Sequence, residues 1–369
     1  MEQSERYMAL DVLRGITVAL MILVNTPGSW QHVYPLLTHS KWHGCTLTDL
    51  VFPFFLFAVG VSLFFSLAGY QNKSGKEALR RVGRRTLLIF ALGIFINSYP
   101  QWMTDYSQLR IMGVLQRIAV AYGIAALIVL AWPRRWLPGI GAFILLSCWG
   151  ILYFFGGSDP YSLSGNAAIP LDRAILGENH LYRGFGIPFD PEGILGSLPS
   201  AVTVLTGYLA GMMIRETGGN QALSRLVLSG SALTVAGCLW GVVLPINKPL
   251  WTGSYVLYTA GLATLLFALL IYIIDVKKYK KWSLLFSVFG MNPLLLFILS
   301  VVWGKTLRLL ILIPDGFGHP MPGNAWLYQN IFVPLAGSMN GSLAFALAHI
   351  VFFWLVGYVF YRRRFFVKI

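Results

Sequence analysis

The chain has 369 residues, of which 56% are hydrophobic and only 11% are charged, and its mean hydropathy is +0.67. Soluble proteins carry about 25% charged residues, so this composition excludes that class and indicates a polytopic membrane protein. The net charge of +14 does not indicate a nucleic-acid partner, because the basic residues gather on one side of the predicted helices. Cys45, Cys148 and Cys238 lack the spacing of a metal or redox site, and no metal is expected.

Long apolar runs predict an all-α fold, because a spanning helix needs about 20 apolar residues. We interpret residues 1–369 as a single domain, a bundle of about ten transmembrane helices. The segment 304–314 is a candidate eleventh, re-entrant or interfacial piece, and the outward loops are 27–46, 156–192 and 304–340. No cleavable signal pattern is visible, so the first run is expected to stay as a helix. The predicted spans are 9–26, 47–68, 84–99, 111–132, 136–155, 193–214, 226–245, 252–274, 283–303 and 341–361.

The loop charges predict the orientation of these helices. Of the 28 Lys and Arg residues, 19 flank the helices on the side of the N-terminus. The other side carries Lys41, Arg110, Arg173, Arg183, Lys248, Lys305 and Arg308. Positive charge marks the cytoplasmic side of a membrane protein. Both termini are therefore expected in the cytoplasm, and the loop that contains His39 is expected to face outward.

Residues 39–60, HSKWHGCTLTDLVFPFFLFAVG, place a polar loop directly before a hydrophobic span. A histidine in such a loop could act as a general base or an acyl carrier. It could equally be a solvated side chain, and spacing does not choose between these roles. His39 and His43 are four residues apart, but no third ligand suggests a metal site.

Asp49 and Asn25 each have a structural and a functional interpretation. Thr46 and Asp49 resemble a capping box, and an acid favours a helix N-terminus. Alternatively, Asp49 orients the imidazole of His39 or holds a substrate ammonium. Asn25 ends the first span on the outer side, where it could simply cap the helix.

Charged residues within spans are functional candidates, because a charge in lipid is unfavourable. Asp11 and Arg14 could pair with each other at a spacing of three. Arg117 has no acid nearby in sequence and requires an anion, such as a phosphate, or an acid from another helix. In the loop before the sixth span, Asp190 and Glu192 could bind a cationic sugar or favour the start of the helix.

A series of motifs, in order along nearly the whole chain, resembles the heparan-α-glucosaminide N-acetyltransferase family, which includes lysosomal enzymes and bacterial homologues. The sequence departs from the lysosomal members in lacking their large N-terminal luminal domain, and the segment between Asn25 and His39 is longer. The motifs are LDVLRG (10–15), VN (24–25), HSKWHGCTLTDLVFPFFLF (39–57), RIMGVLQR (110–117), LDRAILGENHLY (171–182), DPEGILG (190–196), INKPLWTGSY (246–255), DVKKY (275–279), GMNP (290–293) and YRRRFFVKI (361–369).

The resemblance implies that acetyl-CoA in the cytosol donates an acetyl group to a glucosamine-type sugar on the far side of a bacterial inner membrane. The family's catalytic histidine, in H-x-x-W-x-G, matches His39, and its asparagine near the acetyl group matches Asn25. We expect Asp49 to act with them. Donor binding is expected from Asp11, Arg14, Arg117 and Asn292. Acceptor binding is expected from Trp42, His180, Asp190 and Glu192.

Two other functions remain open from the sequence. Ten spans with polar outer loops also suit an amino-sugar or sugar permease, although no pair of broken segments in matching halves supports transport. A transferase of the same family could act on another cell-envelope glycan. Membrane lipids surround the protein in every case, and a homodimer is compatible with the sequence.

Overall fold

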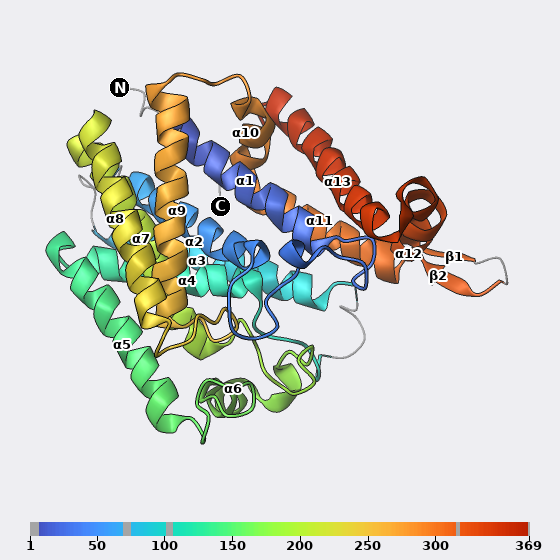
Figure 1. The fold of residues 1–369 in the computed structure, drawn as a ribbon, viewed down its shortest axis with the longest axis horizontal. Coiled ribbons are helices and arrows are strands. Elements are labelled where there is room, and N and C mark those ends of the chain that lie inside the picture. Colours follow the sequence, from blue (N-terminus) through green and yellow to red (C-terminus); the bar gives the residue numbers. More distant parts are fainter. Residues whose placement is uncertain (1–6, 69–74, 101–105, 315–317, 368–369) are drawn as a thin grey trace.

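The computed structural model describes residues 7–68, 75–100, 106–314 and 318–367, and helices dominate these residues (Figure 1). Arg6, Lys73 and Lys368, which count toward the predicted charge asymmetry, lie outside them. The α-helices are α1 (Met8–Asn25), α2 (Leu47–Ala68), α3 (Gly75–Ser98), α4 (Val114–Ala131), α5 (Leu137–Phe155), α6 (Ala168–Leu176), α7 (Ile194–Thr217), α8 (Gly219–Trp240), α9 (Gly253–Ile271), α10 (Ser283–Met291), α11 (Pro293–Leu309), α12 (Gly323–Leu327) and α13 (Val333–Arg362). The remaining elements are η1 (Pro35–Leu37), η2 (Arg134–Trp136), η3 (Glu178–His180), η4 (Tyr272–Val276), η5 (Tyr328–Phe332), β1 (Leu312–Pro314) and β2 (Pro320–Pro322).

The predicted all-α class is confirmed. In the described part of the chain, eight helical stretches are long and apolar enough to cross a membrane, and a bent pair raises the number to nine. The ten predicted spans all fall largely on helices. Nine of them coincide with these stretches, and the tenth lies on α3, which begins at Gly75, well before the predicted start at residue 84. The early turns of α3 carry exposed Arg80, Arg81 and Arg84, so this helix has a basic half and an apolar half.

The predicted span 283–303 is not a straight helix. α10 and α11 meet at an angle of 81°, and the break falls at Asn292 and Pro293. Proline has no backbone N–H and its ring clashes with the preceding turn, so it kinks or breaks a helix. The Asn292 amide donates to the backbone oxygen of Phe365 at 2.9 Å and accepts the N–H of Val367 at 2.9 Å. Asn292 was expected to bind the donor, but its buried side chain instead fixes the end of the chain against this bend.

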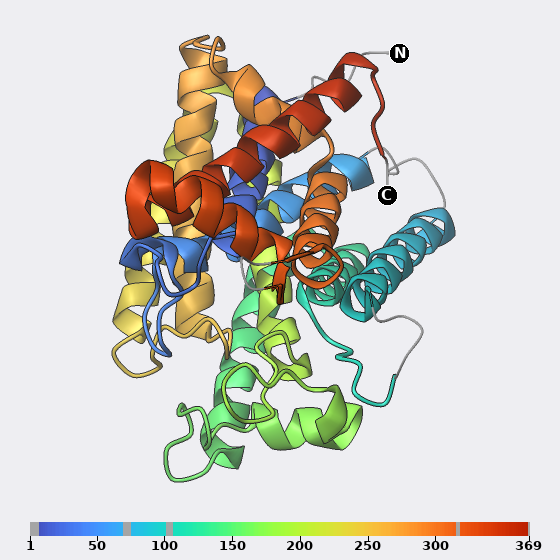
Figure 2. The same ribbon diagram turned by 90° about the vertical axis from the view of Figure 1, so that its right-hand side faces the viewer.

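The segment 304–314 does not form an eleventh helical piece. α11 continues to Leu309, and the chain then enters β1, which pairs antiparallel with β2 in a register of Leu312 opposite Pro322. α13 is kinked at Gly337, whose φ of 77° lies in the left-handed region that favours glycine. The residues before the kink form a separate arm with η5, which Figure 2 shows folded away from the long straight part of α13.

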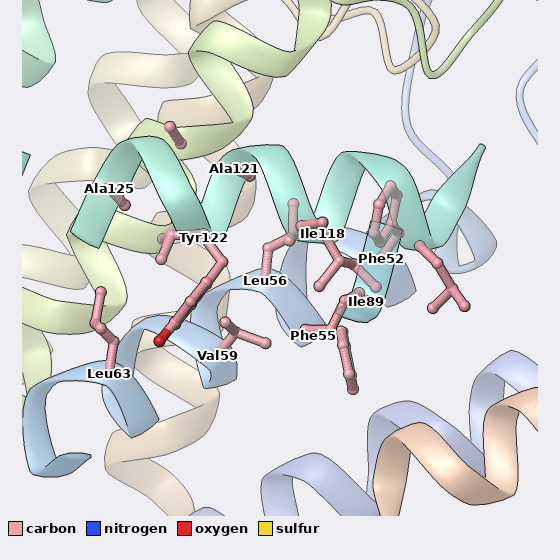
Figure 3. Packing of buried hydrophobic residues seen from close by; sticks show 14 of the residues in the cluster. Phe52, Phe55, Leu56, Val59, Leu63, Ile89, Ile118, Ala121, Tyr122 and Ala125 are labelled. Atoms are coloured by element: carbon pink, nitrogen blue, oxygen red, sulfur yellow. The ribbon is translucent and has the colours of Figure 1, made fainter. Parts of the chain in front are cut away.

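A continuous apolar core joins α2, α3 and α4 (Figure 3). Leu56 and Leu63 of α2 face Ile118 and Tyr122 of α4, and Ile89 of α3 closes one side. This packing aligns α2 and α4 side by side, with the start of each helix at the same end. The loops 27–46 and 156–192, which were predicted to face outward, and the α8–α9 connection gather at that end, whereas the α9–α10 connection lies at the opposite end (Figure 1).

Candidate active site

Asp49 lies in the first turn of α2 and uses both carboxylate oxygens. Oδ2 accepts the N–H groups of Ser40 and Thr46, each at 3.0 Å, and the Thr46 hydroxyl at 3.1 Å. Oδ1 lies 2.6 Å from Nδ1 of His39. The two sequence interpretations of Asp49 therefore hold together: the same side chain caps the helix and orients the imidazole.

The His39–Asp49 pair combines a fixed acid with an accessible imidazole. The Asp49 side chain is 1% exposed and the His39 side chain is 52% exposed. A carboxylate can only accept a hydrogen bond, so the Nδ1 proton is directed toward Asp49 and Nε2 remains as the basic nitrogen. This arrangement is the one expected of a histidine that serves as a general base or nucleophile.

His39 opens onto a cavity of about 440 Å³ that is large enough for a sugar ring. Its lining combines aromatic rings with polar side chains, which is the usual pattern of a small-molecule site. The aromatic residues are Phe52, Tyr182, Phe185, Trp251 and Phe297, and the polar or charged residues are Asn25, His39, Ser40, Thr48, Asp49, Arg110, Glu192 and Lys248.

Asn25 stands between this cavity and a second one of about 370 Å³. The two cavities share Asn25, Arg110, Val114 and Phe297. The walls of the second cavity carry Lys305, Arg308 and several amides, and none of the described residues that line it is an Asp or Glu. Asn25 is therefore placed where an acyl group could pass between two compartments.

Arg110 organises one side of the His39 cavity. Its guanidinium contacts both oxygens of Asp190, at 2.9 and 2.7 Å, and Oε2 of Glu192 at 2.5 Å, and it lies 4.6 Å from the centre of the Tyr182 ring. Burial alone would lower the pKa of Arg110, but these hydrogen bonds and charges raise it above its ordinary value. The Asp190 side chain is fully buried in this pair and does not line the cavity, whereas Glu192 does.

Trp42 and His180 do not line either cavity. Trp42 donates its indole N–H to the backbone oxygen of Tyr161 at 2.8 Å and packs edge-on against Phe185 at 5.8 Å. His180 Nδ1 lies 2.7 Å from the backbone oxygen of Leu109. Both side chains therefore support the outer loops, in place of the direct acceptor contact that was expected of them.

The four residues expected to bind the donor are not in one place. Arg14 contacts Asp11 at 3.3 Å and also the hydroxyl of Ser62. Arg117 donates to the backbone oxygen of Gly193 at 3.1 Å and lies 5.0 Å above the Trp251 ring.

Trp251 packs on Phe52, which precedes Ser62 by ten positions on α2, or about 15 Å along a helix. Arg117 is therefore at the His39 end of the bundle and Arg14 is far from it. The buried Arg117 faces the acid-bearing loop before α7, so it does not share one site with Arg14.

The sequence analysis missed Lys248, Arg110, Tyr182 and Phe185. Each is a polar or aromatic residue in a loop between apolar spans. In INKPLW, Lys248 is a lone cation before a span, on the side that is predicted to face outward and has few positive residues. That feature could have marked Lys248 as a candidate.

The family model and the relatives that match this chain all carry the same description. The family model described as "Heparan-alpha-glucosaminide N-acetyltransferase, catalytic" matches residues 6–237. The Mus musculus protein of that name is 29% identical over 430 aligned positions, covering 99% of this chain and 61% of the relative. The Homo sapiens protein is 28% identical over 423 positions, covering 99% of this chain and 60% of the relative. The chain thus spans about three fifths of the length of these relatives.

Proposed function

Because this chain belongs to the heparan-α-glucosaminide N-acetyltransferase family, we propose that it transfers the acetyl group of acetyl-CoA to the amine of a glucosamine-type sugar. The observation that carries the proposal is the His39–Asp49 pair, held at 2.6 Å and opening onto a cavity that can contain a sugar. Amine acetylation requires a base and an orienting group at the reacting atoms, and this pair supplies both.

We propose direct transfer within a ternary complex. Neutral His39 accepts a proton from the acceptor amine through Nε2 while the nitrogen attacks the thioester carbon. A C–N bond forms, the C–S bond breaks, and the proton on Nε2 is passed to the departing thiolate to give free coenzyme A. The alternative is an acetyl-imidazole on His39, and an intermediate of that kind hydrolyses readily beside water.

Asn25 is proposed to stabilise the oxyanion that forms on the thioester carbonyl. An amide N–H directed at that oxygen is a common source of transition-state stabilisation. Asn25 ends α1 and borders both cavities, so it lies beside any acyl group that approaches His39.

The acceptor sugar is proposed to lie against Tyr182 and Phe185. Aromatic rings bind the apolar faces of sugars, and these two line the His39 cavity together with Glu192. The Glu192 carboxylate can accept hydrogen bonds from an amine or a hydroxyl.

The donor is proposed to enter from the cytoplasmic side. Coenzyme A carries phosphates and does not cross lipid, and the basic loops would attract it at the inner face of a bacterial inner membrane. With the ten spans predicted from the apolar runs, the same charge distribution supports both termini inside. The basic start of α3, with Arg80, Arg81 and Arg84, is a candidate attraction site for the nucleotide.

The proposal is tested with purified protein in proteoliposomes, acetyl-CoA labelled in its acetyl group, and a panel of amino sugars. His39→Ala should abolish transfer and leave acetyl-CoA binding nearly intact, because the nucleotide is held elsewhere. His43→Ala is the matched control, since His43 lies in the same loop and outside the cavity lining. Full transfer activity in His39→Ala would refute the site. Uptake of labelled glucosamine without acetylation would favour the permease.

A further inference from the structure

The connection between α8 and α9 is fixed onto the loop that carries His39. The backbone N–H of Gly44 donates to the oxygen of Ile246 at 2.8 Å. The fully buried Asn247 donates to the backbone oxygen of Trp42 at 3.0 Å and accepts the N–H of Leu250 at 2.8 Å. These hydrogen bonds fix the position of the α8–α9 connection relative to the loop of His39, although the two segments are some 200 residues apart in sequence.

Trp251 also anchors the α8–α9 connection. Its φ of 52° places a bulky side chain in the left-handed region, which a residue of this kind occupies only when its surroundings require it. The ring is 1% exposed and packs between Phe52 and Tyr255, each at 5.2 Å between ring centres. The backbone N–H of Trp251 donates to the backbone oxygen of Lys248 at 3.0 Å, so the backbone of Lys248 is held firmly.

The Lys248 side chain reaches the catalytic pair. Its Nζ lies 3.1 Å from Nδ1 of His39 and 3.5 Å from Oδ1 of Asp49, and the side chain is only 16% exposed. Nδ1 can form one hydrogen bond, and the shorter distance of 2.6 Å assigns it to Asp49. Lys248 therefore acts on the imidazole through its charge.

We propose that Lys248 is a positioning residue that keeps His39 neutral while Asp49 orients it. Alone, the Asp49 carboxylate would favour the doubly protonated imidazolium, which can neither accept a proton nor attack a thioester. A cation beside the ring opposes the second proton. The proposal rests on the transferase function proposed above, and Lys248 lies beyond the residues matched by the family model.

Other charged groups near this cluster do not replace Lys248. Burial first, and then Asp49, raise the pKa of the Cys45 thiol to about 12, so Cys45 is uncharged at neutral pH. Arg110 pairs with both Asp190 and Glu192, so these three groups together keep one negative charge and do not oppose protonation of His39. Burial lowers the pKa of Lys248, whereas Asp49 and Glu192 act in the opposite direction and favour the ammonium.

The test measures the protonation of His39 directly. Diethyl pyrocarbonate modifies neutral imidazoles, and mass spectrometry of the peptide that contains residue 39 gives the extent of modification at each pH. In the purified full-length protein, Lys248→Met should raise the midpoint for His39 by about one pH unit, because a repelling charge is removed. Lys248→Arg should leave it unchanged, and Asp49→Asn should lower it. His32, in the same loop region, is the internal reference.

The acid limb of kcat/KM for acetyl transfer should shift with the same midpoints. A Lys248→Met protein with an unshifted His39 midpoint would overturn the proposal, even if its activity were lost, since a purely structural residue would give that result. Lys248→Gln provides a second neutral variant in case the Met variant does not fold. If the chain transfers no acetyl group, the modification midpoints still decide the role of Lys248, so the two failures are distinguishable.

Discussion

Asp172, in the segment between α5 and α7, shows how burial changes the pKa of a single residue. Its side chain is fully buried, Oδ1 accepts the N–H of Ile194 at 2.9 Å, and Oδ2 has no partner among the described residues. Burial raises the pKa of Asp172 to about 6, and the nearby Asp190 adds to the effect. The acid is therefore neutral in weakly acidic solution and becomes charged near neutrality.

This shift predicts a pH-dependent loss of stability. The folded pKa lies above the unfolded value, so the unfolded state loses its proton first as pH rises from about 4 to about 6. The resulting penalty is absent at low pH and reaches roughly 3 kcal/mol above pH 6, at about 1.4 kcal/mol for each pKa unit. Asp172→Asn removes the charge and should therefore raise the denaturation midpoint more at pH 8 than at pH 5.

Thermal denaturation of the detergent-purified protein at the two pH values measures this difference. Asp159→Asn is the control, because Asp159 lies in the same outer loop and is exposed. An equal effect of Asp172→Asn at both pH values would contradict the assignment.

At the scale of the helices, α2 and α7 are held together by glycines that allow close backbone contact. A Cβ placed on Gly207 would lie 2.0 Å from the backbone oxygen of Phe57, and one on Gly60 would lie 1.9 Å from that of Val204. Small residues at helix interfaces are a general device of membrane proteins, because they let backbones approach. Since α2 carries Asp49 in its first turn, this contact also fixes the site.

Gly207→Ala should therefore force the two helices apart and destabilise the protein by about 1–3 kcal/mol. Gly139→Ala in α5 is the matched control, because a Cβ there meets no described atom within 4 Å. Alanine also favours a helix over glycine, so the control should be neutral or slightly stabilising. Equal melting temperatures for the two variants would show that the α2–α7 contact can relax.

At the scale of the whole molecule, the prediction concerns orientation in the membrane. The outer loops near α6 and the α9–α10 connection lie at opposite ends of the bundle (Figure 1). In a protein with Cys45, Cys148 and Cys238 replaced by alanine, Glu178→Cys should react with an impermeant thiol reagent in intact cells. Tyr279→Cys should react only after permeabilisation. Both positions are exposed, so access to the reagent depends on sidedness. Labelling of position 279 in intact cells would refute the orientation.

The sequence by itself determined the all-α membrane class, because apolar runs of spanning length have few other stable structures. It also placed His39 in a polar loop before a helix capped by Asp49, since both features are local and depend on residues within about ten positions. The sequence did not predict two irregular features of the helices. The 81° bend at Asn292 divides an apolar run that was predicted as one span, and α3 begins with a basic segment ahead of its predicted span.

Only the tertiary structure decided which side chains share the site. Asp190 pairs with Arg110 across 80 positions, so it supports the cavity wall, and Glu192 is the acid of this loop that lines the cavity. Arg117 contacts the backbone oxygen of Gly193 and the Trp251 ring. Lys248 reaches His39 across 209 positions. Charge interactions depend on distance in space, and helix packing sets those distances between segments whose separation along the chain carries no information about them.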